Sequence, residues 1–453
     1  MVRLAPRLVV AGTSSGVGKT TVATGLMAAL RARALRIGAA KVGPDFIDPG
    51  YHALATGRPS RNLDAWMCGP DAIPSLAGRA AAATDVLVVE GVMGLFDGSG
   101  DPAGPVASTA QVAGLLQAPI VLVVDASAVG ASVAALVHGF ATFDPAVRVA
   151  GVVLNRVGSD SHESLLREAL APSGVHVLGA LRRHGDYAWR DRHLGLVPVV
   201  EHPDRIRRSI AALAAAVARD CDLDAVVALA RSAPFVEVPD PPAARHVGRT
   251  VLAVAGGPAF SFAYPDNLEL LAQAGAELAV FDPLTDNRLP EGASGLYAGG
   301  GFPEIFAPRL AANRPLLDDV RGKVGAGLVT WAECGGLLWL ARSLDGQPMA
   351  GVLPAHGRMT DRLTLGYRRA TIRATSPLGP AGTDVRGHEF HYSAVDPPGD
   401  DLDWSGRTGA GRAGFAGPTL LASYLHVHMG AAPQLAERLV ATCTAGDRES
   451  SGG

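Results

Sequence analysis

The stretch that most constrains the fold of this 453-residue chain lies near its N-terminus. An apolar run, residues 8–11, leads into a loop that reads Gly12-Thr13-Ser14-Ser15-Gly16-Val17-Gly18-Lys19-Thr20-Thr21. The small and apolar residues 22–30 then favour a helix. A buried strand, a Gly-rich loop and a helix in this order are typical of a phosphate-binding loop (P-loop), because backbone N–H groups and the positive end of the helix dipole face the anion.

The P-loop residues predict how ATP would bind. Lys19 is expected to contact the β- and γ-phosphates, and the Thr20 hydroxyl is expected to bind Mg²⁺. Five residues separate Gly12 from Gly18, one more than in the usual motif, so Thr13 takes the place of the first glycine. A Gly-rich turn that binds nothing is the alternative, but strand, loop, Lys-Thr pair and helix all agree on the P-loop. The predicted ATP-binding residues of the loop are Thr13, Gly16, Val17, Gly18, Lys19, Thr20 and Thr21.

Composition and charge exclude several classes of function. The length predicts two or three domains, and 48% hydrophobic residues are enough for large cores. A net charge of −3 gives no support for binding nucleic acid or a membrane surface. No uncharged run approaches the roughly 18 residues of a membrane helix, and no N-terminal signal is visible. The four cysteines are scattered without CxxC spacing, so we expect a cytoplasmic enzyme with reduced thiols.

Polar side chains follow the predicted strands of the first domain. Apolar runs alternate with helical stretches over residues 1–233, which predicts a doubly wound parallel sheet that binds ligands at its carboxyl edge. Lys41, Asp45 and Asp48 follow one run, and Glu90 follows the next. We expect Asp45 and Glu90 to join the P-loop threonine in binding Mg²⁺, and Lys41 to contact the transferred phosphoryl group. A polar turn without a ligand is the alternative for the Lys41 loop.

Four more side chains of this domain are candidate ligand contacts. Arg58 and Arg61 suit carboxylates or phosphates through bidentate contact, although a surface loop explains them equally well. Asp97, in a Gly-flanked loop, is expected to hold metal or substrate. Asn155 ends a predicted strand, and its amide can match the edge of a purine, so it is a candidate adenine contact.

A second domain is expected beyond a proline-rich stretch. Residues 234–247 lack any periodicity and predict a stiff, extended linker. A second α/β pattern covers residues 248–446, and residues 447–453 are predicted to be a disordered tail.

Cys334 is the candidate nucleophile of this second domain. It lies in a Glu-Cys-Gly-Gly turn between a predicted strand and helix, which is typical of a nucleophile elbow whose helix N-terminus lowers the thiol pKa. The glycines at 299–301 could supply N–H groups to an oxyanion hole, which we predict to comprise Gly300, Gly301 and Gly335. A buried core cysteine is the alternative. Spacing alone allows either His426 or His428 as the base, because on a strand both would face the same side.

The two sites together suggest why they share one chain. A Cys–His hydrolase can release ammonia from glutamine, whereas an ATP site can convert a carboxylate into an acyl phosphate. Phosphate then leaves when ammonia attacks.

Over nearly its full length the chain resembles the cobyrinate (or hydrogenobyrinate) a,c-diamide synthases of corrinoid biosynthesis. The resemblance rests on the P-loop and on the stretches Lys41-Val42-Gly43-Pro44-Asp45, Gly57-Arg58-Pro59-Ser60-Arg61-Asn62-Leu63-Asp64, Glu90-Gly91-Val92-Met93-Gly94-Leu95, Arg192-His193-Leu194-Gly195-Leu196, Ala332-Glu333-Cys334-Gly335-Gly336, Gly387-His388-Glu389-Phe390-His391-Tyr392 and Tyr424-Leu425-His426.

This resemblance implies an α/β protein with a dethiobiotin-synthetase-like P-loop domain followed by a class I glutamine amidotransferase-like domain. It implies that Cys334 is the nucleophile and His426 its base, and that the P-loop spacing is the family's own. The implied partners are a corrin polycarboxylate, ATP and glutamine. A homodimer is compatible with the sequence, and the net charge predicts no nucleic acid or membrane partner. No third carboxylate of the amidotransferase triad is evident in the sequence. The expected substrate-binding residues are Lys41, Asp48, Arg58, Arg61 and Asp97.

Two other functions are weighed against this one. A related tetrapyrrole amidase, such as a nickel-sirohydrochlorin a,c-diamide synthase or a cobyric acid synthase, shares much of the pattern. A P-loop switch ATPase with a degenerate amidotransferase-like domain is disfavoured by the intact Cys334 and His426. The sequence leaves open whether the corrin carries cobalt, the order of amidation, and the roles of His388 and His391.

Overall fold

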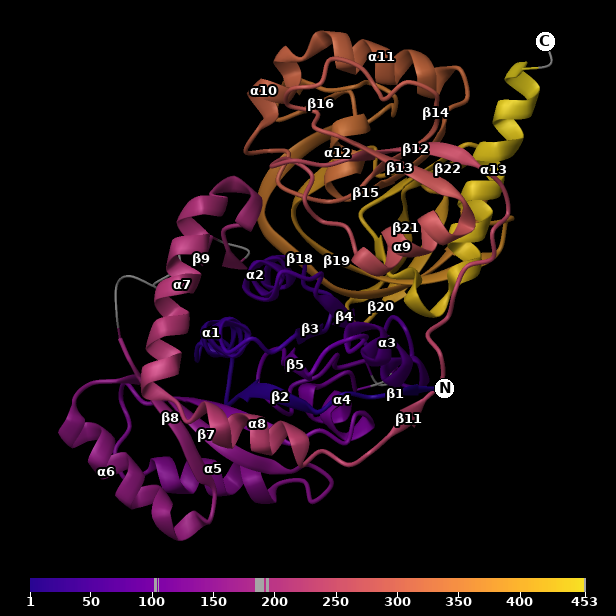
Figure 1. Ribbon diagram of the computed structural model, residues 1–453. Coiled ribbons are helices and arrows are strands. Elements are labelled where there is room, and N and C mark those ends of the chain that lie inside the picture. The colour runs from indigo at the N-terminus through magenta and orange to yellow at the C-terminus, as the bar shows by residue number, and fades with distance from the viewer. Residues whose placement is uncertain (102–103, 105, 184–190, 193–194, 452–453) are drawn as a thin grey trace. The chain divides into compact units, whose positions relative to one another are not determined.

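The computed structural model describes the chain apart from residues 102–103, 105, 184–190, 193–194 and 452–453 (Figure 1). The chain divides into two compact units, Met1–Pro241 and Pro242–Gly453. The division falls inside the stretch 234–247, where the sequence predicts the linker. Of the sequence stretch 192–196, His193 and Leu194 lie outside the described residues.

The first unit is built on a seven-stranded parallel sheet in the order β4-β3-β5-β2-β6-β7-β8. The strands are short and almost continuously apolar, as expected where helices cover a parallel sheet. In sheet order they span Arg61–Leu63, Ile37–Val42, Val86–Glu90, Arg7–Gly12, Ile120–Asp125, Val149–Val157 and His176–Arg182. The helices are α1 (Lys19–Ala32), α2 (Ile47–Thr56), α3 (Ile73–Ala80), α4 (Thr109–Leu115), α5 (Val133–Thr142), α6 (Asp160–Leu170), α7 (Pro203–Asp220) and α8 (Leu223–Arg231).

The strand order puts the P-loop at a switch point of the sheet. Strand β2 lies between β5 and β6, and the chain moves to β3 on one side of it and later to β6 on the other. Loops at the carboxyl ends of such central strands diverge and leave a crevice for ligands.

The second unit has a six-stranded sheet in the order β13-β12-β14-β15-β23-β22, parallel except for the edge strand β22. In sheet order its strands span Ala276–Phe281, Thr250–Ala255, Ala293–Ala298, Val329–Glu333, Leu420–Ser423 and Phe415–Gly417. Its helices are α9 (Pro265–Ala274), α10 (Ala307–Ala312), α11 (Arg314–Gly325), α12 (Gly335–Leu340) and α13 (Pro433–Ser451).

A second, mostly antiparallel sheet of this unit is dominated by two long curved strands, β18 (His356–Ile372) and β19 (Thr383–Asp396), which lie side by side in Figure 1. The other strands of this sheet are β16 (Ser343–Leu344), β17 (Gln347–Pro348), β20 (Leu402–Gly406), β21 (Gly409–Ala413) and β24 (His426–Val427). Strand β24 pairs with β19, whereas β23, just before it in the chain, belongs to the parallel sheet. The segment 420–427 therefore connects the two sheets, and this connection positions His426.

Four segments differ from the sequence predictions. The small residues of the stretch 126–140 predict one helix, but α5 begins only at Val133, since the residues before it are small and include a glycine. Helices α10 and α11 were not predicted, because each is short and carries a proline in its first turn. Part of the expected linker, Glu237–Val238 (β11), pairs with Val2–Arg3 (β1) at the N-terminus. The predicted disordered tail is helical as far as Ser451, where it continues α13.

Among the described helices, none has both the length and the apolar character that crossing a membrane requires.

Helices α1 and α7 cross closely at Gly25, where an added Cβ would come within 2.7 Å of Val217 and 3.0 Å of Leu213. We expect Gly25→Leu to lower the free energy of unfolding by about 1–3 kcal/mol, because overpacking forces the two helices apart. Gly139→Leu is the matched control, since Gly139 lies in α5 with open space around it. Chemical denaturation followed by circular dichroism measures both, and equal effects would contradict the close crossing.

Candidate active sites

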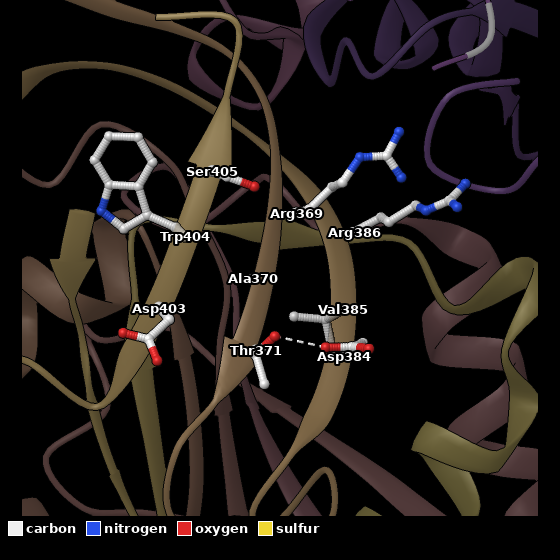
Figure 2. A pocket seen from close by; sticks show the side chains of 9 residues that line it. All are labelled: Arg369, Ala370, Thr371, Asp384, Val385, Arg386, Asp403, Trp404 and Ser405. Atoms are coloured by element: carbon white, nitrogen blue, oxygen red, sulfur yellow. Dashed lines mark hydrogen bonds between the residues drawn. The ribbon is translucent and has the colours of Figure 1, made fainter. Parts of the chain in front are cut away.

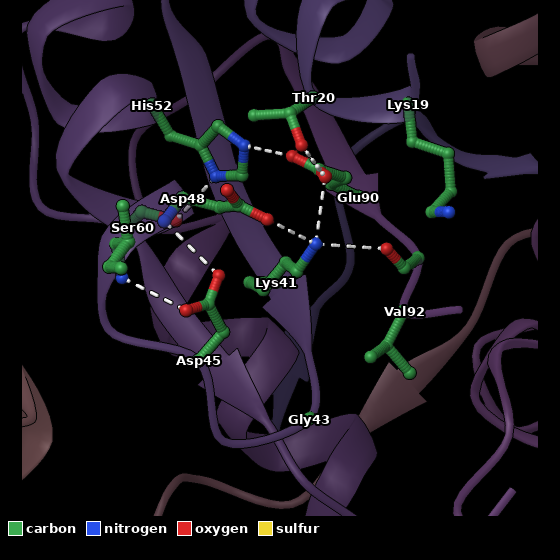
Figure 3. Close-up of polar contacts among 12 residues, drawn as sticks. Lys19, Thr20, Lys41, Gly43, Asp45, Asp48, His52, Ser60, Glu90 and Val92 are labelled. Atoms are coloured by element: carbon green, nitrogen blue, oxygen red, sulfur yellow. Dashed lines mark hydrogen bonds and ion pairs between the residues drawn. The ribbon is translucent and has the colours of Figure 1, made fainter. Parts of the chain in front are cut away.

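The carboxylate of Glu90 is the centre of the first site, at the carboxyl edge of the first sheet (Figure 3). Glu90 ends β5 and is paired in register with Lys41 on β3. Its Oε1 accepts hydrogen bonds from Lys41 Nζ and Thr20 Oγ1, each at 2.7 Å, and its Oε2 lies 2.5 Å from His52 Nε2. The side chain is completely buried, so these three partners replace the water that a carboxylate normally requires.

Lys41 does not present a free ammonium group. Its Nζ lies 2.6 Å from Asp48 Oδ2, 2.7 Å from Glu90 Oε1 and 3.0 Å from the carbonyl oxygen of Gly91. Three donors thus meet three acceptors, whereas the sequence predicted that Lys41 would contact the phosphoryl group and that Asp48 would contact substrate. In the structure the two side chains pair with each other in a buried position, and their contacts with the phosphoryl group and the substrate stay predictions.

The charges of this cluster shift one another's pKa. Burial alone would raise the pKa of Glu90, but the Lys41 charge and the hydrogen bonds from His52 and Lys41 outweigh burial and hold it well below its usual value. Burial alone would lower the pKa of Lys41, but Asp48 and Glu90 outweigh it and raise that pKa. Both groups are therefore charged at neutral pH.

Glycines allow the backbone conformation of the P-loop. Gly16 and Gly18 have φ angles of +78° and +93°, which favour glycine, and a Cβ on Gly12 would come within 2.7 Å of Val17. Lys19 Nζ donates to the Ser14 carbonyl oxygen at 2.9 Å, so the side chain curls over the loop. Burial and the nearby Lys41 lower the pKa of Lys19 to about 8.

Asn155 is hydrogen-bonded to this loop. Its Nδ2 donates to the Val17 carbonyl oxygen at 2.9 Å, and a Cβ on Gly18 would come within 2.1 Å of that nitrogen. In the structure Asn155 stabilises the P-loop turn through this hydrogen bond, and its contact with adenine stays a prediction.

Hard oxygen donors at this site fit Mg²⁺ bound together with phosphate. The Thr20 hydroxyl and the Glu90 carboxylate meet directly, which suits an ion that takes one or two protein ligands beside phosphate oxygens. Asp45 is less available, since its two oxygens accept the N–H groups of Ile47 and Asp48 in the first turn of α2. Among the described residues, no group of three or more His, Cys, Asp or Glu side chains could hold an ion without such added ligands.

The remaining predicted substrate contacts lie on separate elements. Arg58 donates to the Ala82 carbonyl oxygen at 2.8 Å, and Arg61 is a buried residue of β4 beside Ala40 of β3. Asp97 Oδ2 accepts the Gly94 N–H at 2.8 Å within its own loop. Each of these side chains thus has partners within the protein, and its contact with substrate stays a prediction.

Cys334 has the backbone geometry of a nucleophile elbow. Its φ and ψ are +48° and −97°, a conformation that is strained for a residue with a side chain. It follows β15 directly and precedes α12, and its N–H donates to the Ser423 carbonyl oxygen of β23 at 2.8 Å. The turn needs Gly336, where a Cβ would meet the Ala298 carbonyl oxygen at 2.1 Å.

His426 reaches Cys334 because β15 and β23 are neighbours. Glu333 is paired with Ser423, so the chain beyond β23 turns back over the elbow and brings His426 to it. Burial alone would lower the pKa of His426, but its interactions with Cys334 and Glu333 outweigh burial and raise the pKa to about 10. The geometry favours His426 over His428 as the partner of the thiol.

His428 faces elsewhere, contrary to the expectation that both histidines share a side. Strand β24 ends at Val427, so strand alternation does not extend to His428. The His428 ring packs on Tyr264, with its Nε2 3.8 Å from Asp266 Oδ2, and its Nδ1 accepts the Gly430 N–H.

The histidines at 388 and 391 lie near His426. The His388 ring lies 5.3 Å from the His426 ring, and burial together with His426 and His391 lowers its pKa well below the usual value. His391 stacks on Tyr424, and burial lowers its pKa to about 4. Neutral rings here confine the positive charge to His426.

Gly300 does not fit the predicted oxyanion hole. Its N–H donates to the Phe262 carbonyl oxygen at 3.0 Å, so this donor is already used. Gly300 instead makes room for the base, because a Cβ there would come within 2.5 Å of the His426 ring. Gly335 and Gly301 are adjacent, since a Cβ on Gly335 would meet the Gly301 nitrogen at 3.1 Å. They remain the predicted donors.

A separate hollow of about 500 Å³ lies on the antiparallel sheet (Figure 2). Arg369 and Arg386 are paired across β18 and β19, and Thr371 donates to Asp384 at 2.6 Å beside them. None of the predicted site residues lines this hollow.

Known proteins resemble both units. Residues 8–196 match the family described as CobQ/CobB/MinD/ParA nucleotide binding domain, and residues 251–434 match the CobB/CobQ-like glutamine amidotransferase domain. A Streptomyces coelicolor protein named hydrogenobyrinate a,c-diamide synthase is 51% identical over 97% of this chain and 97% of its own. A Synechococcus protein named cobyrinate a,c-diamide synthase is 40% identical over 96% of this chain and 98% of its own.

The chain belongs to the hydrogenobyrinate/cobyrinate a,c-diamide synthase family. This confirms the family inferred from the sequence motifs. It also confirms the predicted fold class, a nucleotide-binding α/β domain followed by a glutamine amidotransferase domain. A solved structure described as a glutamine amidotransferase covers 42% of this chain and 98% of its own, at 20% identity and a TM-score of 0.29.

Sequence reasoning missed two residues of these sites in this family member. His52, on α2, contacts both Glu90 and Ser60, but a lone histidine on a helix gave no signal. Glu333 lies 3.9 Å from His426 Nδ1, and its place directly before Cys334 was the one available clue.

Replacing Lys41 tests the buried charge cluster. We expect Lys41→Met to lower the free energy of unfolding by about 3–5 kcal/mol, because it leaves buried carboxylates without a counter-charge. The double variant Lys41→Met/Glu90→Gln should lose less than the sum of the single variants. Lys323→Met is the control, since its pair with Asp319 is partly exposed and worth at most about 1 kcal/mol. Additive losses in denaturation measurements would show that Lys41 and Glu90 do not stabilise each other.

Proposed function

We propose that this chain amidates the a- and c-acetate carboxylates of hydrogenobyrinate or cobyrinate, using ATP and ammonia from glutamine, in cobalamin biosynthesis. The observation that carries the proposal is the presence of two sites in one chain. In one, the P-loop residue Thr20 is hydrogen-bonded to Glu90, and in the other, the elbow residue Cys334 interacts with His426. Near full-length relatives named for this reaction support the choice of substrate.

In the ATP half of the reaction, a substrate carboxylate oxygen attacks the γ-phosphorus, and ADP leaves. The product is an acyl phosphate, in which a carboxylate has gained a good leaving group. Lys19 would stabilise the charge of the phosphates, while the P-loop N–H groups orient them. Thr20 and Glu90 would hold Mg²⁺, which supplies positive charge to the phosphate oxygens when bound.

In the glutamine half, the Cys334 thiolate attacks the side-chain amide carbon, and His426 returns its proton to the departing ammonia. A thioester remains, and water releases glutamate. The ammonia then attacks the acyl phosphate, an amide forms and phosphate leaves. The strained elbow supports this role, because a sharp turn between a strand and a helix is the usual setting of such a nucleophile.

The substrate itself is tested by mass spectrometry of the products. Hydrogenobyrinate, cobyrinate and nickel-sirohydrochlorin are each supplied with ATP, Mg²⁺ and glutamine. We expect two successive amidations of a corrinoid carboxylate substrate, each replacing OH by NH₂. Amidation of nickel-sirohydrochlorin alone would assign the chain to the related tetrapyrrole reaction.

Replacing the nucleophile separates the two halves. We expect Cys334→Ser to lower glutamine-dependent amidation by more than about 10³-fold, because the thioester cannot form efficiently. Free ammonia should still support amidation in this variant. Cys443→Ala is the control, since Cys443 is a buried free cysteine of the same unit. Loss of ammonia-dependent amidation in a folded Cys334→Ser variant would contradict two separate sites.

Replacing the P-loop lysine gives the reverse pattern. We expect Lys19→Met to lower amidation by at least about 10²-fold with either nitrogen source, because transition-state charge on the phosphates loses a donor. Thioester formation from labelled glutamine at Cys334 should persist. Unchanged amidation would contradict the ATP role of the loop.

A further inference from the structure

We propose that Glu333 positions His426 and stabilises its charged form, so that the carboxylate of this Cys–His site precedes the nucleophile in the chain. The inference rests on the proposed role of Cys334 and His426 and names a third residue for that site. No motif of the sequence assigned this role, and neither matched family description does so.

The contacts of Glu333 hold its carboxylate in one orientation. Oε1 accepts the Val427 N–H at 2.8 Å, and Oε2 accepts the Tyr297 hydroxyl at 2.9 Å. The Tyr297 ring is itself fixed, because it stacks on Trp331 with ring centroids 4.4 Å apart. With both oxygens held, Oε2 lies 3.9 Å from His426 Nδ1.

These contacts also connect Glu333 to the backbone segments that carry Cys334 and His426. Val427 directly follows His426, so the bond from its N–H fixes the backbone that carries the base. Glu333 directly precedes Cys334, so the same side chain joins the nucleophile's strand to the base's strand. A glutamate in this place can set the distance between the sulfur and the imidazole.

The charge of the buried Glu333 carboxylate also supports its role beside His426. Glu333 is 1% exposed, and the two hydrogen bonds described above come from neutral donors. A buried carboxylate without a counter-charge is costly, so Glu333 favours the imidazolium that His426 becomes on taking the thiol proton.

The other titratable groups around His426 are Cys334, His388, His391 and Glu389. Burial holds both neighbouring histidines below their usual pKa, so neither supplies a competing positive charge at neutral pH. Glu389 Oε2 lies 3.1 Å from Arg368 Nε, and that pair already balances its charge. Glu333 is therefore the carboxylate that can balance His426.

Glu333→Gln is the decisive variant, because it keeps the shape and the acceptor for Val427 while it removes the charge. We expect kcat for glutamine hydrolysis to fall by about 10²-fold, with the KM for glutamine changed by less than about threefold. We also expect the pH midpoint for alkylation of Cys334 by iodoacetamide to rise, because the thiolate loses part of its imidazolium partner. A purely structural residue would not move that midpoint.

Asp266→Asn is the matched control. Asp266 is equally buried in the same unit, and it lies beside His428 instead of His426. This variant should keep the wild-type alkylation profile. Glu333→Asp restores the charge on a shorter side chain and should recover part of the kcat that Glu333→Gln loses. The same variant serves as the test if Glu333→Gln folds poorly. A wild-type kcat in Glu333→Asp would overturn the positioning role.

The outcomes separate this inference from the proposed function. A wild-type alkylation profile and kcat in folded Glu333→Gln would overturn the inference alone, provided that Cys334→Ser is inactive with glutamine. Glutamine hydrolysis that persists in Cys334→Ser would instead overturn the proposed function. A shift of equal size in Asp266→Asn would also overturn the inference, because the effect would then be general to buried charge.

Discussion

The first unit depends on how it stabilises one buried carboxylate. Glu90 has no access to water, and an unpaired charge in that position would cost several kcal/mol. The pairing of β3 with β5 brings Lys41 to it, α2 brings His52, and the helix after the P-loop brings Thr20. Strand register, helix placement and P-loop are thus fixed by the same side chain. A one-residue slip of β3 would turn Lys41 to the other face and leave Glu90 alone.

The second unit uses the same edge of a parallel sheet for different chemistry. The strand β15 ends in Glu333, and the sharp turn that follows places the buried Cys334 beside His426. The strained conformation costs about 1–3 kcal/mol, which the surrounding packing must offset. Glycines make that packing close, since side chains at Gly300 or Gly336 would meet the base or the neighbouring strand.

Strands and motif positions could be predicted from the sequence because each is local. The apolar run before Cys334 and the glycines after it predict the elbow without knowledge of any partner. Partners distant in sequence could not be predicted in the same way. Glu333 and Tyr297 meet only when β14 and β15 pair, and His52 reaches Glu90 only after α2 packs on the sheet. Gly300 was misassigned for the same reason, since its N–H partner Phe262 lies on a loop 38 residues away along the chain.

The environments of the two glutamates explain how similar positions give different roles. Glu90 faces a lysine that is charged at all relevant pH values, so its negative charge is permanent and suits an ion that stays bound beside phosphate. Glu333 faces neutral donors, so its charge acts on a group that gains and loses a proton, and that group is His426. Exchange of these partners would exchange the roles. A lysine beside Glu333 would neutralise it and weaken the imidazolium, whereas neutral donors alone around Glu90 would raise its pKa and weaken its hold on a cation.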